Sequence, residues 1–109
     1  MKEIVEFLAS KKLVCRRLKA IAPKELGSRK RVEIYLGVAL DDYYCTIMVL
    51  KKKSRVLRKE AGELEKLHNR LCEKVGAAIK RKYLLIDAPL CSKAAALLEE
   101  RGWRIYRFS

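Results

Sequence analysis

Two runs of β-forming residues follow each other across a short polar break, and this pattern constrains the fold more than any other feature. From Arg29 to Leu40, apolar side chains occupy every second position: Val32, Ile34, Leu36, Val38 and Leu40. The segment Tyr43 to Lys53 is rich in β-branched and aromatic residues, and Asp41-Asp42 separates the two runs. A period of two predicts strands, and the short break predicts that they pair as an antiparallel β-hairpin.

The C-terminal third of the chain predicts a strand, a helix and a further strand. Tyr83 to Asp87 is short and almost wholly apolar, which is typical of a strand buried on both faces. A helix is expected from Ser92, as N-cap, through Arg101, and Gly102 suits the end of that helix. Trp103 to Phe108 is expected to form the last strand. A strand, helix and strand in this order imply a parallel pair with a right-handed crossover.

Three further segments predict helices or leave two alternatives open. Lys2 to Lys12 has the apolar spacing of a helix, whereas Leu13 to Ile21 either continues that helix or forms a first strand. A long helix is expected from about Arg55 to Lys80, with Ser54 as its N-cap. The cations at 80–82 would close it, because positive charge suits a helix C-terminus.

The expected order is α-(β)-β-β-α-β-α-β, an α/β (α+β) domain with one mixed sheet flanked by helices. A chain of 109 residues suits one domain with one core, so residues 1–109 are taken as a single basic domain. No stretch approaches the roughly 20 apolar residues of a membrane span. The apolar run at the N-terminus contains Glu3 and Glu6, unlike a signal peptide, so a cytoplasmic protein is expected. The absence of Gln, with Asn69 as the only Asn, resembles the composition of thermophile proteins.

The charge balance indicates a polyanionic partner. Lys and Arg number 26 against 13 Asp and Glu, a formal net charge of +13. Such a charge attracts polyanions, of which nucleic acid is the commonest, and we expect DNA rather than RNA. A membrane surface is not expected, since no helix pairs a basic face with exposed aromatic anchors. The alternative is that the charge only keeps the protein in solution.

Basic residues gather at the start of the first hairpin strand, at the end of the second hairpin strand and near the start of the long helix. If the hairpin pairs as expected, the clusters at 29–31 and 51–53 meet at its open end, close to a helix N-terminus that itself favours anions. The residues expected to contact phosphates are Arg29, Lys30, Arg31, Lys51, Lys52, Lys53 and Arg55, with Arg16 and Arg17 as secondary candidates. The alternative for each cluster is a solvated charge run.

The element order and the ending Leu98 to Phe108 (LEERGWRIYRF) resemble the restriction-endonuclease-like nucleases, and among them the small Holliday-junction resolvases. The resemblance implies a carboxylate on the second strand and an acid-x-Lys motif on the third, which hold Mg²⁺ and assist the attacking water. Asp42 matches the first acid and Lys51 the lysine, but Val49 stands where the second acid is required.

This incomplete motif favours a nucleic-acid-binding protein that does not cleave. The first alternative is a Mg²⁺-dependent nuclease using Asp42, Glu33 and Lys51, and Mg²⁺ is the cofactor only in that case. In the simpler interpretation, Asp41-Asp42 are turn residues and Glu33 is an exposed strand charge. The second alternative is an interaction or assembly subunit, with a homodimer formed through a sheet edge or the long helix.

The remaining polar and aromatic residues have ordinary structural interpretations. Asp87 is expected to hydrogen-bond the turn around Pro89, and His68 to lie at the boundary of the core. The four cysteines lack C-x-x-C spacing and are expected to be buried free thiols, with a disulfide as the alternative. Three tyrosines of the hairpin are expected to pack across strands, although they could stack on bases: Tyr35, Tyr43 and Tyr44.

Overall fold

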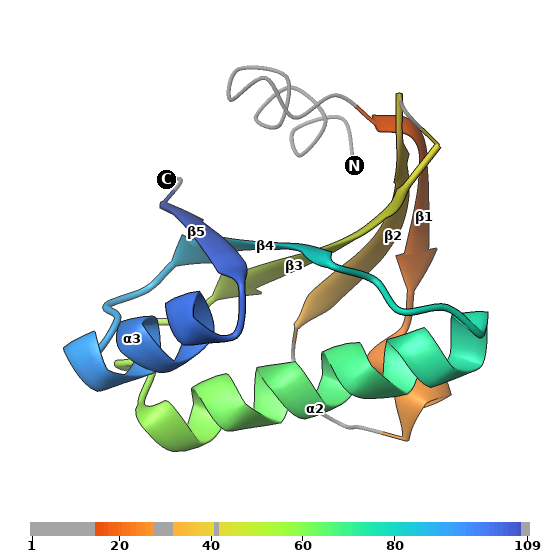
Figure 1. The fold of residues 1–109 in the computed structure, drawn as a ribbon. Coiled ribbons are helices and arrows are strands. Elements are labelled where there is room, and N and C mark those ends of the chain that lie inside the picture. The colour runs from red at the N-terminus through yellow and green to blue at the C-terminus, as the bar shows by residue number, and fades with distance from the viewer. Residues whose placement is uncertain (1–14, 28–31, 41, 108–109) are drawn as a thin grey trace.

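The computed structural model describes residues 15–27, 32–40 and 42–107, which form one mixed sheet with two α-helices on one of its faces (Figure 1). The strands are β1 (Cys15–Ile21), β2 (Glu33–Ala39), β3 (Tyr44–Lys51), β4 (Arg81–Asp87) and β5 (Trp103–Arg107). The helices are the 3₁₀ turn η1 (Pro23–Leu26), α2 (Arg58–Val75) and α3 (Ser92–Glu100). The predicted fold class is confirmed, while the helix predicted at 2–12 lies outside the described residues.

The strands follow one another in the sheet in the same order as in the chain, β1-β2-β3-β4-β5. The first three strands form an antiparallel meander, in which Glu33 lies opposite Val49. β3, β4 and β5 are parallel to one another. The predicted hairpin and the predicted parallel pair are therefore confirmed, and the ambiguous segment 13–21 is a strand from Cys15 onward.

The central strand β3 is buried on both faces. Its residues from Cys45 to Leu50 are all buried. Because successive side chains point to opposite faces, Met48 and Leu50 pack in the core under the helices, whereas Ile47 and Val49 pack in a second cluster on the other face. This second cluster also contains Cys45, Tyr35 and Leu85.

Helix α2 supplies most of the helical side of the core through an apolar stripe at helical spacing. Its buried residues include Ala61, Leu64, Leu67 and Leu71, which pack in the same cluster as Ile34, Met48 and Leu84 of the sheet. Among the described residues, no helix is long and apolar enough to cross a bilayer.

The predicted bounds of the long helix are wrong at both ends. The helix begins at Arg58 after Leu57, and Ser54 does not cap it. Val56 explains the late start: it is fully buried and bridges to Leu90, and its backbone N–H donates to the carbonyl of Pro89 at 2.8 Å. At the other end the helix stops at Val75.

Gly76 ends α2 with a φ of 78°, a left-handed conformation that favours glycine. The cations at 81 and 82, predicted to close the helix, instead begin β4. Helix α3 runs over Ser92–Glu100 with Cys91, not Ser92, at the N-cap position.

A polar group of three residues ties α2 to the ends of β4 and β5 beneath the sheet. The Lys82 Nζ lies 3.2 Å from Glu65 Oε1, and the Trp103 indole N–H donates to the other Glu65 oxygen. The Lys82 ammonium also lies 5.6 Å from the centre of the Trp103 ring. The side chains of Lys82 and Glu65 are largely shielded from water, so each charge needs the other nearby to offset its lost hydration.

The only histidine of the chain is buried in a second polar group. His68 Nδ1 lies 3.0 Å from the hydroxyl of Thr46, and Nε2 lies 3.1 Å from the carbonyl oxygen of Ile79. Burial lowers the pKa of His68, and the nearby charge of Lys82 lowers it further. His68 thus lies inside the core rather than at its boundary, because Thr46 and the Ile79 carbonyl satisfy both ring nitrogens.

Removing Glu65 should destabilise the fold because it leaves the Lys82 charge without its partner. We expect Glu65→Ala to lower the free energy of unfolding by about 3 kcal/mol, the lower end of the range for breaking a buried pair. The double variant Glu65→Leu/Lys82→Met, which removes both charges, should recover much of that loss. Chemical denaturation monitored by circular dichroism measures both values. A double variant as unstable as Glu65→Ala would contradict this account.

The stability of the protein should depend on the protonation of His68. The folded pKa lies below the unfolded value of about 6.5, so the unfolded chain binds the proton more readily. The free energy of unfolding should therefore be level above about pH 6.5 and fall as the pH is lowered below it. Denaturation at a series of pH values tests this. His68→Gln, which cannot titrate, should show no such fall between about pH 5.5 and 6.5, and an equal fall in both proteins would contradict the assignment.

Candidate nucleic-acid interface

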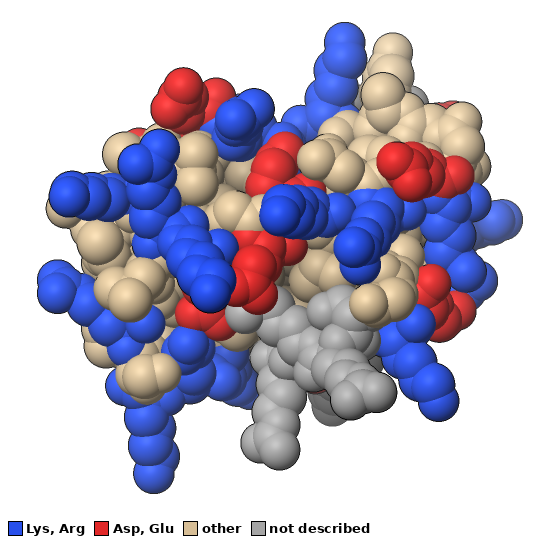
Figure 2. Space-filling view, turned by 90° about the horizontal axis from the view of Figure 1, so that it is seen from below, with Lys and Arg blue, Asp and Glu red and all other residues tan. Residues whose placement is uncertain are grey.

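Exposed cations concentrate where β3 ends and α2 begins. Lys51 ends the strand, and the connection to the helix and the first helical turn add further exposed basic side chains. We name this set the basic edge: Lys51, Lys53, Arg55, Arg58 and Lys59. In Figure 2, which views the molecule from the side of α2, Lys and Arg crowd the end where α2 begins and α3 lies. Phosphate groups would meet several positive charges here at once.

The start of α3 adds to the positive potential beside the basic edge. The backbone N–H groups of Ala94 and Lys93 lower the pKa of the Cys91 thiol, and the charges of Arg55 and Lys93 lower it further. This shift reports that a negative charge is stabilised at this place. A backbone hydrogen bond joins the start of α3 to the segment before α2, since the Cys91 N–H donates to the Val56 carbonyl at 3.0 Å.

Not all of the predicted phosphate contacts come together at this edge. The ammonium group of Lys52 is half-buried and lies 2.7 Å from Glu60 Oε1, so it is engaged within the protein. Arg17 pairs with Val38 near the opposite end of β2, away from Lys51. Arg29, Lys30 and Arg31 lie outside the described residues, as does the side chain of Arg16.

The acids predicted for a nuclease site are separated by the structure. Glu33 lies across from Val49, on the same sheet face as Lys51. Its carboxylate accepts a hydrogen bond from the Tyr35 hydroxyl at 3.3 Å, and burial, followed by the Glu33 charge, raises the pKa of Tyr35. Asp42 lies in the β2–β3 turn with a φ of 70°.

The structure does not bring Asp42 together with Lys51, and Asp42 lies in the turn, as the simpler interpretation predicted. Strands rise about 3.3 Å per residue, so β3 separates the turn from Lys51 by about 23 Å. The physical reason is the hairpin itself: the turn and the open end lie at opposite ends of the same strand. Glu33, not Asp42, is the acid of β2 that lies near Lys51.

The structure adds one acid that the sequence did not place at this edge. Asp87 ends β4 in register with Lys51, and its carbonyl accepts the N–H of Lys52 at 3.2 Å. No cluster of three or more His, Cys, Asp or Glu side chains suited to a metal ion is present in the described part of the chain. Val49, which has no ligating atom, stands where the motif requires its second acid.

Of the three described cysteines, only Cys45 is buried. Cys72 and Cys91 are half-buried, so the expectation of buried thiols holds for one of the three. Cys15 has no described side chain.

Three solved structures share this fold across nearly the whole chain. EndoMS in its apo form matches with a TM-score of 0.61 at 18% identity over 99% of this chain. A repair endonuclease from Pyrococcus abyssi matches with a TM-score of 0.60 at 17% identity over 100% of it. EndoMS in a complex with double-stranded DNA matches with a TM-score of 0.55 at 20% identity over 99%.

The chain shares its fold with these endonuclease structures. The resemblance predicted from the element order is thereby confirmed at the level of the fold. The chain spans less than half of the length of these structures, 45%, 45% and 44% respectively. No family model matches the sequence, and no curated protein does.

The thiol of Cys91 should react faster than that of Cys72, because a lower pKa leaves more thiolate at neutral pH. Both side chains are half-buried, which makes Cys72 an internal control. Alkylation by iodoacetamide over time, followed by peptide mass spectrometry, measures the two rates. Equal rates at the two cysteines would contradict the proposed stabilisation of negative charge at the start of α3.

Proposed function

We propose that the chain binds DNA through phosphate contacts at the basic edge and does not cleave it. The observation that carries this proposal is the gathering of five exposed cations at one end of β3 and the first turn of α2, on a nuclease fold. Unpaired backbone N–H groups at the start of a helix add to the attraction for phosphate. Contacts of this kind position a protein on nucleic acid without identifying the bases.

Double-stranded DNA is the ligand that the structural neighbours favour. EndoMS has been solved in a complex with double-stranded DNA, and its fold matches almost the whole of this chain. Because phosphate contacts dominate, binding should be weakly dependent on sequence and strongly dependent on salt. A preference for DNA over RNA is part of this proposal.

From the pairing of β2 with β3, the strands that carry Glu33 and Lys51, we infer that the protein does not cleave DNA. The side chain opposite Glu33 is Val49, which is buried in the second cluster beside Tyr35 and Leu85. A carboxylate in this apolar cluster would be costly to ionise. The position is therefore used for packing the sheet rather than for holding a metal ion.

A metal-dependent nuclease is the second candidate. It is favoured by the placement of Glu33, Lys51 and Asp87 on one face at the same end of the sheet. Incubation of labelled DNA with the protein and Mg²⁺, followed by electrophoresis, distinguishes the two. Cleavage that is lost in Glu33→Gln and in Asp87→Asn would establish the nuclease, whereas intact DNA would support the binding protein.

Neutralising the basic edge should weaken DNA binding and flatten its dependence on salt. For Lys53→Ala/Arg58→Ala/Lys59→Ala, we expect the slope of log affinity against log salt to decrease by up to about three, roughly one for each phosphate contact. Fluorescence anisotropy with a labelled duplex between about 50 and 200 mM salt measures this slope.

The matched control for this experiment removes the same charge from elsewhere. Lys24→Ala/Lys66→Ala/Lys74→Ala neutralises three exposed lysines of η1 and α2, outside the basic edge. Its salt slope should stay close to that of the unmodified protein. An equal loss in both triple variants would show that only net charge matters and would contradict a defined interface.

A further inference from the structure

The end of the sheet opposite the basic edge carries two adjoining depressions. One, of about 460 Å³, is lined by residues of the β2–β3 turn and of the loop before β4, including Tyr43, Tyr44 and Lys80. The other, of about 370 Å³, lies at the start of β4 and β5 and is lined by residues including Tyr83 and Arg104. Lys80 and Arg81 line both, so the two depressions lie side by side, and we refer to them together as the groove.

The turn end of this groove exposes an unusual amount of apolar surface. Four large hydrophobic side chains are exposed in the described part of the chain, and two of them line the depression at the turn. They are Tyr43 and Tyr44, with 66% and 42% of their surfaces exposed, while Leu40, 68% exposed, lies in the same turn. An exposed apolar patch beside polar groups is typical of a binding surface.

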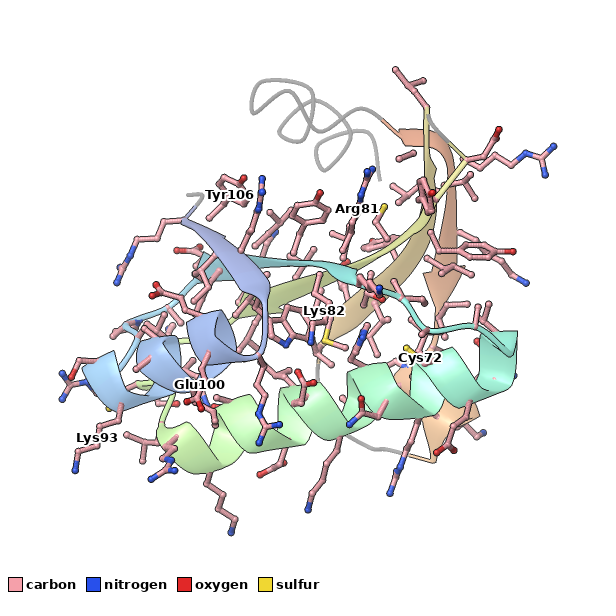
Figure 3. The ribbon with its side chains drawn as sticks, viewed as in Figure 1. Cys72, Arg81, Lys82, Lys93, Glu100 and Tyr106 are labelled. Atoms are coloured by element: carbon pink, nitrogen blue, oxygen red, sulfur yellow. The ribbon has the colours of Figure 1, made fainter. Side chains whose placement is uncertain are left out.

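Arginine positions one of the tyrosine rings. The guanidinium carbon of Arg81 lies 5.4 Å from the centre of the Tyr43 ring, within the range of a cation–π contact. Figure 3 shows Arg81 and Tyr106 on the face of the sheet away from α2 and α3, whereas Lys82 points toward α2. Lys82 also lines the second depression, but its ammonium group is engaged by Glu65.

Cations continue along the groove from the turn to β5. Lys80, Arg81 and Arg104 are exposed, and Arg104 lies in register with Tyr83 across the parallel pair β4–β5. The Tyr83 ring in turn lies 6.4 Å from that of Tyr106. Among the described residues that line the two depressions, Asp42 is the one acid. The groove thus alternates aromatic rings with positive charge.

We propose that this groove binds a short stretch of unpaired nucleic acid. Aromatic rings stack on bases of any sequence, and cations between them neutralise the phosphates. A duplex keeps its base faces within its own stack, so Tyr43 and Tyr44 can stack only on unpaired bases. The length of β3 separates this groove from the basic edge, so the two surfaces are distinct.

The test compares binding of single strands and duplexes by variants of the two exposed tyrosines. The probes are fluorescein-labelled oligo-dT and oligo-U of about 12 nucleotides, a length within the site sizes of such grooves, and a blunt duplex. Tyr43→Ala/Tyr44→Ala should weaken oligonucleotide binding by about tenfold or more and leave duplex affinity unchanged. Tyr43→Phe/Tyr44→Phe keeps both rings and should bind within about twofold of the unmodified protein.

Three outcomes would overturn the proposal. They are wild-type affinity for the oligonucleotides in the alanine variant, an equal loss in the phenylalanine variant, and no binding of either oligonucleotide by the unmodified protein. Binding of the duplex alone would leave the proposed function intact, whereas binding of no nucleic acid would reject both. Comparison of oligo-dT with oligo-U identifies which sugar the groove accepts.

Photo-crosslinking supplies a second readout. A single strand that carries 4-thiothymidine should crosslink to Tyr43 or Tyr44 within the tryptic peptide 32–51, and fragmentation of the peptide locates the crosslinked residue. Crosslinks confined to residues 51–59 would place the strand on the basic edge and contradict the groove.

Discussion

The arrangement of this molecule depends on the central strand β3. It is buried on both faces, and it pairs with β2 in the antiparallel sense and with β4 in the parallel sense. These two registers decide which residues share an end of the sheet. Glu33, Lys51 and Asp87 meet at one end, while the tyrosines of the turn and the first residues of β4 meet at the other. Since a one-residue slip would turn every side chain to the wrong face, burial of β3 fixes both surfaces together.

The sequence predicts those parts of the fold whose periodicity has one interpretation. The alternation through Val32–Leu40 fits only a strand, and the apolar run at 83–87, followed by a helix and a strand, fits only a parallel pair. Leu13 to Ile21 carries apolar residues at spacings that suit either a helix or a strand, so its pairing with β2 had to come from the tertiary structure. The start of α2 was placed too early because nothing local shows that Val56 is buried and hydrogen-bonded.

The candidate sites could be predicted only where their residues lie in one segment of the sequence. The run from Lys51 to Arg55 is visible in the sequence, although Lys52 proves to be engaged by Glu60. The position of Asp87 beside Lys51 depends on the register between β3 and β4, which no local pattern contains. Asp42 was matched to the nuclease motif only through the resemblance, whereas its interpretation as a turn residue agrees with the structure. The sequence shows the pair Tyr43-Tyr44, but only the structure shows that these two side chains are exposed while Tyr35 is buried.

The agreement between strand order in the sheet and strand order in the chain has a kinetic consequence. The pairs β1–β2 and β2–β3 close over short connections, and β4 reaches β5 across a single short helix. Only the junction of β3 with β4 must wait for a long intervening segment, α2 and its flanking loops, to close. Because loop closure must precede the contacts that reward it, this junction is the natural barrier to folding. We therefore expect substitutions of side chains that pack across it, such as Met48 and Leu84, to slow folding more than substitutions in the two outer strands.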